Sequence, residues 1–166
     1  MIYTEFSDVF YENIKEKHKN EHLCGMRLCT KMLEKYFNIA NPVIKRTENG
    51  KPYIDAENVF FSISHTENRA YCAVSDKNIG IDAEYITERD DKKIRSFAKR
   101  FFVENEINEL EKDDFSVISF LSVWTKKEAC LKLYDSTLSQ IEKIDSTAAN
   151  VHTYIDGNYI VSIATE

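Results

Sequence analysis

The order in which hydrophobic periodicity changes along the chain is the feature that most restricts its fold. Apolar residues recur at helical spacing through about the first 40 residues. The two runs are Phe6, Phe10 and Ile14 with Lys17, then Leu23, Met26, Cys29 or Thr30, Leu33 and Phe37. Strand-like runs at 59–64, 70–75 and 79–84 follow, separated by short polar turns that are typical of an antiparallel meander.

The second part of the chain repeats this order. Residues 90–112 and 114–133 return to helical spacing, and 151–155 and 159–163 flank a tight-turn signal at 156–158, which predicts a closing hairpin. Helices, strands, helices and strands in this order predict an α+β fold made of two halves of similar plan, 1–78 and 79–166. Each half is too small for a comfortable core of its own, so we expect one compact unit.

Charge and composition exclude several classes of function. The chain holds 22 Lys plus Arg against 28 Asp plus Glu, a formal charge of −6, which argues against nucleic-acid binding. No apolar run approaches the roughly 18 residues of a membrane helix, so we expect no membrane association. The first residues lack the basic and apolar stretches of a signal peptide, and the four cysteines form no C-x-x-C pair. We therefore expect reduced thiols and a cytoplasmic location.

Two carboxylates lie two positions apart in the third strand-like run. In Gly80-Ile81-Asp82-Ala83-Glu84, the alternation of a strand places Asp82 and Glu84 on the same side. Two acids on one face are costly unless a cation or solvent compensates them. The alternative interpretation is an exposed strand with an acidic outer face.

A second acidic position lies on a predicted helix, in Trp124-Thr125-Lys126-Lys127-Glu128-Ala129-Cys130-Leu131-Lys132. Glu128 and Lys132 are four residues apart and share a helix face. An ordinary exposed ion pair would have the same spacing. If Glu128 instead faces the two strand carboxylates, three oxygen ligands converge and suit Mg²⁺, and the nearby lysines suit a phosphate or pyrophosphate.

Two further segments carry polar groups that could hold phosphate. In Phe61-Ser62-Ile63-Ser64-His65-Thr66, hydroxyls and an imidazole come at the end of a strand. Lys51 lies in the stiff turn Gly50-Lys51-Pro52. Each segment is also explained as a plain polar turn.

Taken together, the order and spacing of these segments resemble the Sfp-type 4′-phosphopantetheinyl transferases. The resemblance covers residues 50 to 132 and includes Arg100-Phe101-Phe102 with Glu106. Its most specific parts are the family motifs G-[IV]-D-[IV]-E, here at 80–84 with Ala83 in place of the branched residue between the acids, and W-[ST]-x-K-E-x-x-x-K, here at 124–132.

The resemblance implies two pseudo-symmetric α+β halves, each an antiparallel sheet packed on a long helix, with the active site in the cleft between them. It implies transfer of 4′-phosphopantetheine from coenzyme A to a serine of an acyl or peptidyl carrier protein, with Mg²⁺ and with release of 3′,5′-ADP. The family works as a monomer, and we expect the same here.

Carried over by motif, the metal ligands would be Asp82, Glu84 and Glu128, and Glu128 would also be the general base. Lys132 would stabilise the pyrophosphate and the leaving group, with Lys127 assisting. Coenzyme A would further contact Lys51, Ser64 and His65.

The chain departs from the family pattern at Glu21, where an arginine is usual; Lys19, His22 or Arg27 would have to compensate. Because the net charge is acidic, docking of an acidic carrier would depend on a local basic surface, for which we expect Lys92, Lys93, Arg95, Lys99 and Arg100. Two other functions remain open at this stage, a Mg²⁺-dependent phosphohydrolase using the same acids and a degenerate nucleotide-binding scaffold.

Overall fold

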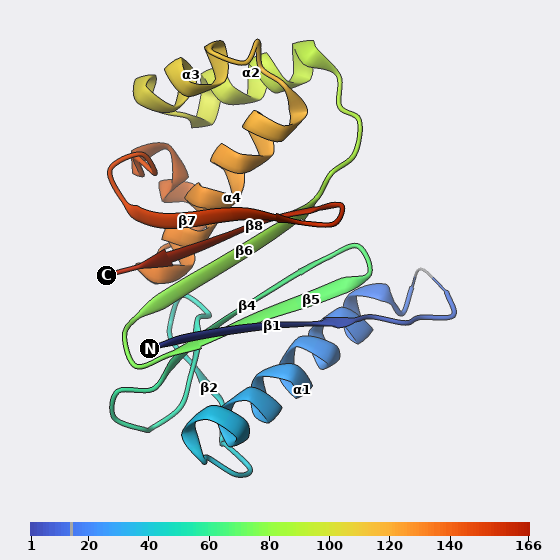
Figure 1. The fold of residues 1–166 in the computed structure, drawn as a ribbon, viewed down its shortest axis with the longest axis vertical. Coiled ribbons are helices and arrows are strands. Elements are labelled where there is room, and N and C mark those ends of the chain that lie inside the picture. Colours follow the sequence, from blue (N-terminus) through green and yellow to red (C-terminus); the bar gives the residue numbers. More distant parts are fainter. Residues whose placement is uncertain (14) are drawn as a thin grey trace.

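The computed structural model describes residues 1–13 and 15–166, so that Ile14 of the predicted helical run lies outside the described residues (Figure 1). Its elements in chain order are β1 (Ile2–Asp8), α1 (Lys17–Phe37), β2 (Lys45–Arg46), β3 (Pro52–Tyr53), β4 (Phe60–Thr66), β5 (Arg69–Ser75), β6 (Ile79–Tyr85), α2 (Asp91–Phe101), α3 (Glu104–Glu111), α4 (Val117–Leu133), the 3₁₀ helix η1 (Leu138–Lys143), β7 (Asn150–Asp156) and β8 (Tyr159–Thr165).

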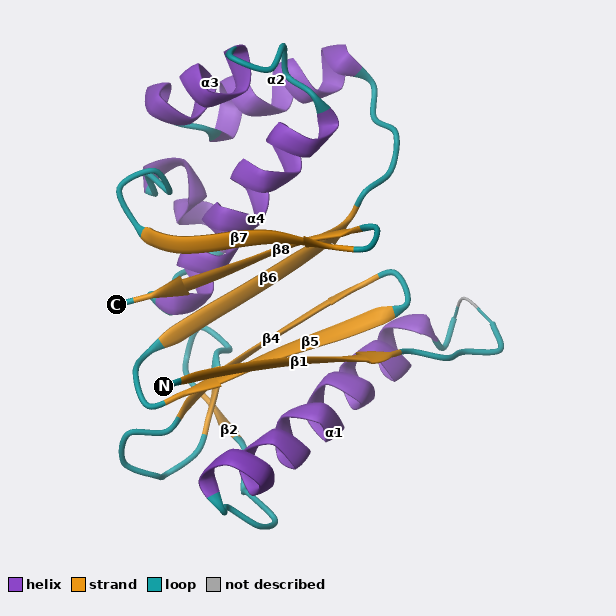
Figure 2. Cartoon of the chain, in the orientation of Figure 1, coloured by secondary structure: helices purple, strands orange, loops and turns teal. Residues whose placement is uncertain are grey.

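Two three-stranded antiparallel sheets form the middle of the molecule, and the helices lie outside them (Figure 2). The first has the strand order β1-β5-β4 and packs on α1; the second has the order β6-β8-β7 and packs on α4. A short ladder of β2 and β3 flanks the first sheet. The structure thus confirms the predicted α+β class and the closing hairpin, and the predicted helix over 114–133 is α4. The division into halves at 78/79 stays a prediction.

The chain start is a strand, and the prediction of helix over the first residues is wrong there. Strand β1 pairs with β5, from Ile2 opposite Ser75 to Asp8 opposite Arg69. Its side chains alternate between exposed and half-buried. Tyr3 stacks on Tyr36 of α1 with ring centroids 3.9 Å apart. Phe6 and Phe10 have the four-residue spacing of a helix face. Both side chains are exposed, however, so this spacing does not mark a buried face.

Two further expectations need correction. The strand runs do not form a meander, because β6 leaves β5 and pairs with β8 of the second sheet. The single helix predicted over 90–112 is two helices, α2 and α3. Between them Phe102 takes an extended conformation and stacks on Phe120, with centroids 5.7 Å apart. The Glu106 carboxylate then accepts the Val103 N–H at 3.0 Å, which begins the new helix.

Side-chain hydroxyls connect the two sheets between β4 and β6. The N–H groups of Ile81, Ala83 and Tyr85 donate to the hydroxyls of Ser62, Ser64 and Thr66 at 3.1, 3.2 and 3.2 Å. The other side of β6 pairs with β8, so these hydroxyls satisfy the N–H groups that would otherwise be buried without a partner. The alternating Ser-x-Ser-x-Thr pattern of β4 therefore joins the sheets.

Helix α4 crosses β6 at closest approach over Gly80. A Cβ atom at Gly80 would lie 2.0 Å from the carbonyl oxygen of Ala129 and 2.6 Å from the backbone nitrogen of Leu133. Only glycine permits this contact, which brings the acids of β6 next to the acid of α4. All four cysteines carry free thiols. No helix within the described residues combines the length and the apolar character that crossing a bilayer requires.

Candidate active site

Asp82 of β6 is the most tightly held of the three predicted carboxylates. It is 7% exposed, and its Oδ1 accepts hydrogen bonds from the Ser64 hydroxyl and from Lys132 Nζ, each at 2.8 Å. Lys132 Nζ also donates to the carbonyl oxygen of Ile81 at 2.9 Å. In this arrangement the ammonium of Lys132 supplies the positive charge that the buried carboxylate requires.

Glu84 and Glu128 lie near enough to Asp82 for the negative charges to influence one another. Burial, together with Asp82 and Glu84, raises the pKa of Glu128 to about 7, against an opposing effect of Lys132. Burial and Asp82 also raise the pKa of Glu84. The Trp124 indole donates to Glu84 Oε1 at 3.3 Å, which brings β6 and α4 together at this point. The three carboxylates therefore form a cluster with an excess of negative charge.

The chemistry of this donor set fits a hard divalent cation, since Mg²⁺ prefers carboxylate oxygens together with water and phosphate oxygens. The side chains are not yet arranged for ligation: within the described residues, no group of three or more His, Cys, Asp and Glu side chains has a geometry that could hold a metal ion. Asp82 is bonded to Ser64 and Lys132, and Glu84 to Trp124. Metal binding would require these carboxylates to exchange partners.

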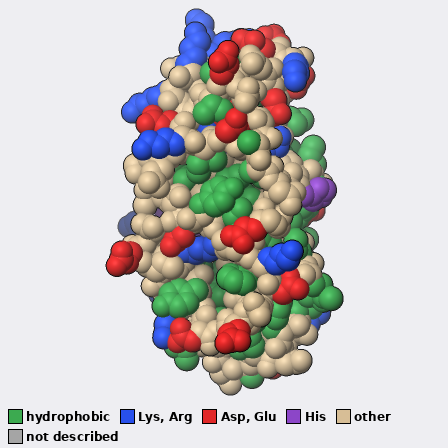
Figure 3. Space-filling view, turned by 90° about the vertical axis from the view of Figure 1, so that its left-hand side faces the viewer, with side chains coloured by type: hydrophobic (Ala, Val, Ile, Leu, Met, Phe, Trp, Pro, Cys, Tyr) green, Lys and Arg blue, Asp and Glu red, His purple; other side chains and the backbone are tan. Residues whose placement is uncertain are grey.

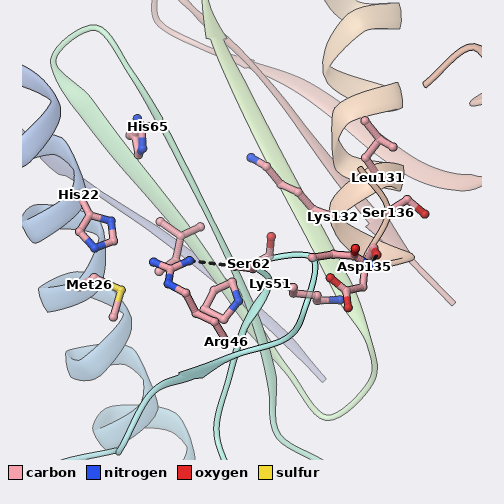
Figure 4. Close-up of a pocket in the computed structure, with 14 residues that line it drawn as sticks. His22, Met26, Arg46, Lys51, Ser62, His65, Leu131, Lys132, Asp135 and Ser136 are labelled. Carbon is pink, nitrogen blue, oxygen red and sulfur yellow. Dashed lines mark hydrogen bonds between the residues drawn. The ribbon is translucent and has the colours of Figure 1, made fainter. Parts of the chain in front are cut away.

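A cavity of about 270 Å³ reaches Lys132, whose Nζ contacts Asp82 of the carboxylate cluster. Figure 4 shows side chains that line this cavity. Helix α1 and the end of α4 form its two sides, with the β2–β3 turn and β4 between them. The lining side chains include His22, Met26, Arg46, Lys51, Ser62, Ile63, His65, Leu131, Lys132 and Asp135. Lys132 belongs both to this cavity and to the carboxylate cluster, so the two features form one continuous site.

The structure brings most predicted binding residues to this site, but two of them have other partners. Lys51 lines the cavity, yet its Nζ donates to Asn78 Oδ1 at 2.7 Å and to the Leu133 carbonyl oxygen at 2.9 Å. Burial lowers its pKa. The Ser64 hydroxyl accepts from Ala83 and donates to Asp82, so it orients that carboxylate. His65 faces the cavity, and burial lowers its pKa.

Lys127 lies away from the cavity, contrary to the expectation that it assists at the phosphate. It is 0% exposed, and its Nζ donates to Glu106 Oε2 at 2.7 Å and to the carbonyl oxygen of Ile144. Glu106 also accepts from the backbone N–H and the hydroxyl of Ser146 at 2.9 and 2.7 Å. This buried network ties α3, α4 and the segment before β7 together, so the motif lysine here is a structural residue.

Sequence reasoning did not identify Arg46, Met26 and Asp135 as parts of the site. Arg46 precedes the Gly50-Lys51-Pro52 turn, and its guanidinium donates to the Gly50 carbonyl oxygen at 2.8 Å. Only the folding of the β2–β3 turn against α4 brings it to the cavity. Of the residues expected to compensate for Glu21, His22 lines the cavity, whereas Arg27 lines a separate groove between α1 and β1.

A family model and curated relatives that resemble this chain all point to the same protein family. Residues 78–165 match the family model described as the 4′-phosphopantetheinyl transferase superfamily. Similar curated proteins include the 4′-phosphopantetheinyl transferase Gsp of Aneurinibacillus migulanus, 38% identical over 128 residues, covering 75% of this chain and 51% of the relative. The 4′-phosphopantetheinyl transferase HetI of Nostoc sp. is 32% identical over 138 residues, covering 78% of this chain and 57% of the relative. The chain thus spans about half the length of these relatives.

Proposed function

The chain belongs to the 4′-phosphopantetheinyl transferase superfamily, and on that premise we propose that it transfers 4′-phosphopantetheine from coenzyme A to a serine of an acyl or peptidyl carrier protein. The second product is 3′,5′-ADP. The observation that carries the proposal is the continuity between the carboxylate cluster and the cavity through Lys132, which contacts both. Such a site offers binding for a phosphorylated nucleotide directly beside groups suited to phosphoryl transfer.

Coenzyme A would occupy the cavity. Its phosphates would meet the cationic and imidazole groups of the lining, which are Arg46, His22, His65 and Lys132, while Met26 and Ile63 offer apolar contact to the adenine ring. Lys51 would add positive charge from the β2–β3 turn, where its Nζ contacts the last carbonyl oxygen of α4. Ser64 would contribute through the orientation of Asp82, in addition to the phosphate contact implied by the family motif.

We assign a Mg²⁺ ion to Asp82, Glu84 and Glu128. When bound, the ion supplies neutralisation of the charge on the pyrophosphate. Its ligands would come from β6 and α4, which the contact over Gly80 holds together. Lys132, once released from Asp82, would be available to the phosphate oxygens.

The residues of the chain supply the remaining chemistry. The serine hydroxyl of the carrier forms a new bond to the phosphorus nearer the pantetheine, and the bond from that phosphorus to the 3′,5′-ADP oxygen breaks. Glu128 accepts the serine proton, directly or through one water molecule. Burial and the neighbouring carboxylates raise its pKa to about 7, a value that a bound cation would lower. Lys132 offsets the negative charge of the leaving group.

Helix α2 offers a surface for the carrier protein. It carries five cationic residues and one acid, and its groove is lined by Lys92, Lys93, Arg100 and the rings of Phe97 and Phe101. Phe97 contacts Trp124 with centroids 5.0 Å apart, and Trp124 bonds to Glu84. The basic surface therefore adjoins the carboxylate cluster. The Arg95 guanidinium already donates a hydrogen bond to Asp114 Oδ1 at 2.5 Å. We therefore assign docking mainly to the other four cationic residues of α2.

The decisive experiment is incubation of the chain with coenzyme A, Mg²⁺ and a panel of apo carrier proteins, followed by intact-mass spectrometry. We expect one carrier to gain the mass of a single 4′-phosphopantetheine group, with 3′,5′-ADP released in equal amount. Chelation of the metal should abolish the reaction, and added Mg²⁺ should restore it.

Glu128→Ala should abolish transfer, whereas Glu109→Ala, which removes a carboxylate of a surface ion pair on α3, should leave it intact. Hydrolysis of coenzyme A without modification of any carrier would favour a phosphohydrolase instead. Binding of coenzyme A with no turnover would favour a nucleotide-binding scaffold.

A further inference from the structure

Glu21 of α1 is a buried carboxylate that the proposed reaction does not use. It is 2% exposed and does not line the cavity. Its Oε2 lies 3.6 Å from Nδ1 of His65 and 3.3 Å from Nδ1 of His18, and its Oε1 lies 3.9 Å from Lys17 Nζ. A buried carboxylate is costly unless basic groups compensate it. Of these three basic side chains, only His65 lines the cavity.

We propose that Glu21 is a positioning residue for ligand binding, whose carboxylate orients His65 and stabilises the charged form of that imidazole when a phosphate group occupies the cavity. This inference rests on the proposed function, since it takes coenzyme A or 3′,5′-ADP as the ligand. With Nδ1 toward Glu21, the other ring nitrogen of His65 is available to donate to a phosphate oxygen. A carboxylate next to one ring nitrogen fixes the orientation of metal-bound histidines in this way, and we apply the same argument to a histidine that faces a phosphate.

The charges around His65 determine when it holds a proton. Burial lowers the pKa of His65, Glu21 raises it, and Lys132 and His22 lower it further. Arg46 and Lys51 line the same cavity, and His18 and Lys17 face Glu21 from its own helix. The net effect of these groups favours the uncharged imidazole in the unliganded site. A phosphate in the cavity places negative charge on its other side and favours uptake of a proton.

The affinity of the cavity for phosphate should fall as the pH rises. Because the charged imidazole binds phosphate better, the contribution of His65 to affinity is complete below its pKa and declines as the pH rises above it. Removing the Glu21 carboxylate lowers that pKa, so the decline begins at lower pH. A lowering by about one unit would weaken binding up to about tenfold above the pKa and leave binding at low pH unchanged.

The test compares the wild-type chain with Glu21→Gln. Calorimetry measures the Kd of coenzyme A and of 3′,5′-ADP from about pH 5 to about pH 8, and NMR follows the His65 ring resonance over the same range. The ratio of the two Kd values at each pH cancels the titration of the ligand itself. We expect a ratio near one at the lowest pH and weakening of roughly three- to tenfold in the variant near pH 7.5, together with a lower pKa of His65.

Two controls separate positioning from other effects. Glu67→Gln removes a carboxylate that also pairs with Lys17, at 3.1 Å, and should leave the pKa of His65 and the Kd ratio nearly unchanged. In a His65→Gln background, Glu21→Gln should cause no further weakening. Thermal unfolding of each variant checks that it is folded.

A purely repulsive effect of Glu21 on the ligand would change the affinity in the opposite direction. Loss of a negative charge near an anionic ligand should tighten binding if Glu21 acts only through repulsion. Equal or tighter binding by Glu21→Gln at every pH, or an unchanged pKa of His65, would therefore overturn the inference while leaving the proposed function intact. Absence of any binding to the wild-type chain would overturn both.

Discussion

Two lysines on the same helix show how the surroundings of a residue decide its role. Lys127 and Lys132 are five positions apart on α4, which turns them about 140° from each other. Lys127 is fully buried against Glu106, and Lys132 reaches the cavity and Asp82. The motif that contains them is compatible with either task for each residue. Their partners on α3 and β6 make one structural and the other a candidate for phosphate binding.

Lys127→Met should strongly destabilise the fold. The change leaves the Glu106 carboxylate buried without its cation, and breaking a buried pair on one side costs about 3–5 kcal/mol. Lys126→Met is the matched control, because its pair with Glu109 lies at the surface and such pairs contribute roughly 0–1 kcal/mol. Urea denaturation of both variants measures the difference. Equal stability of the two would contradict the structural role of Lys127.

At the scale of elements, the joint between β4 and β6 holds the site together. Strand β4 lines the cavity, and β6 carries Asp82 and Glu84. The three hydroxyl bonds between the strands take the place of a backbone ladder. The hydroxyl of Ser64 extends this joint to Asp82, so the same contact that connects the sheets also orients a candidate metal ligand.

Ser62→Ala should therefore destabilise the fold more than the removal of a single hydroxyl group normally does. It leaves the Ile81 N–H buried without an acceptor, and such a loss costs about 1–3 kcal/mol. Ser7→Ala on β1 is the matched control, because the Ser7 hydroxyl has only a weak contact with a backbone oxygen, at 3.4 Å. Chemical denaturation measures the free energy of unfolding of both variants. An equal, small loss of stability in both would contradict the role of the Ser62 hydroxyl in joining β4 to β6.

At the scale of the whole molecule, charge is distributed unevenly. Acidic and basic side chains are interspersed along the face shown in Figure 3, and the net charge is −6. Helix α2 nevertheless concentrates cations at one end of the molecule, opposite α1 (Figure 1). An acidic partner would be repelled by the whole chain and attracted by this helix, which favours one docking orientation.

Reversing the charge of Lys92 and Lys93 to Glu should raise the KM for the carrier protein roughly tenfold, because exposed charge contacts contribute up to about 1 kcal/mol each. The affinity for coenzyme A should stay the same, since neither lysine lines the cavity. Reversal of Lys31 and Lys77, exposed on the other half of the chain, is the control. Steady-state kinetics at two salt concentrations checks this, and an unchanged KM would exclude α2 as the docking surface.

Prediction from sequence succeeded where local pattern and local structure agree. The spacing of Phe120, Leu121 and Leu131 predicted α4, and the Asp-Gly-Asn turn predicted the β7–β8 hairpin. It failed at β1, whose exposed aromatics imitate a helix, and at β6, whose partner strand lies about 80 residues later in the chain. The residues close to β1 and β6 in the sequence do not determine which distant strand each of them pairs with.

The sequence by itself determined the element types over most of the chain, the acids on one face of β6 and the motif that identifies the family, because these depend on periodicity and short spacings. The tertiary structure decided which charges meet. Whether a lysine contacts a buried glutamate or a cavity, whether Arg46 reaches the site, and why Glu21 lies behind His65 all depend on the packing of distant segments. The energy of a charge is set by its burial and its partners, and only the folded chain supplies both.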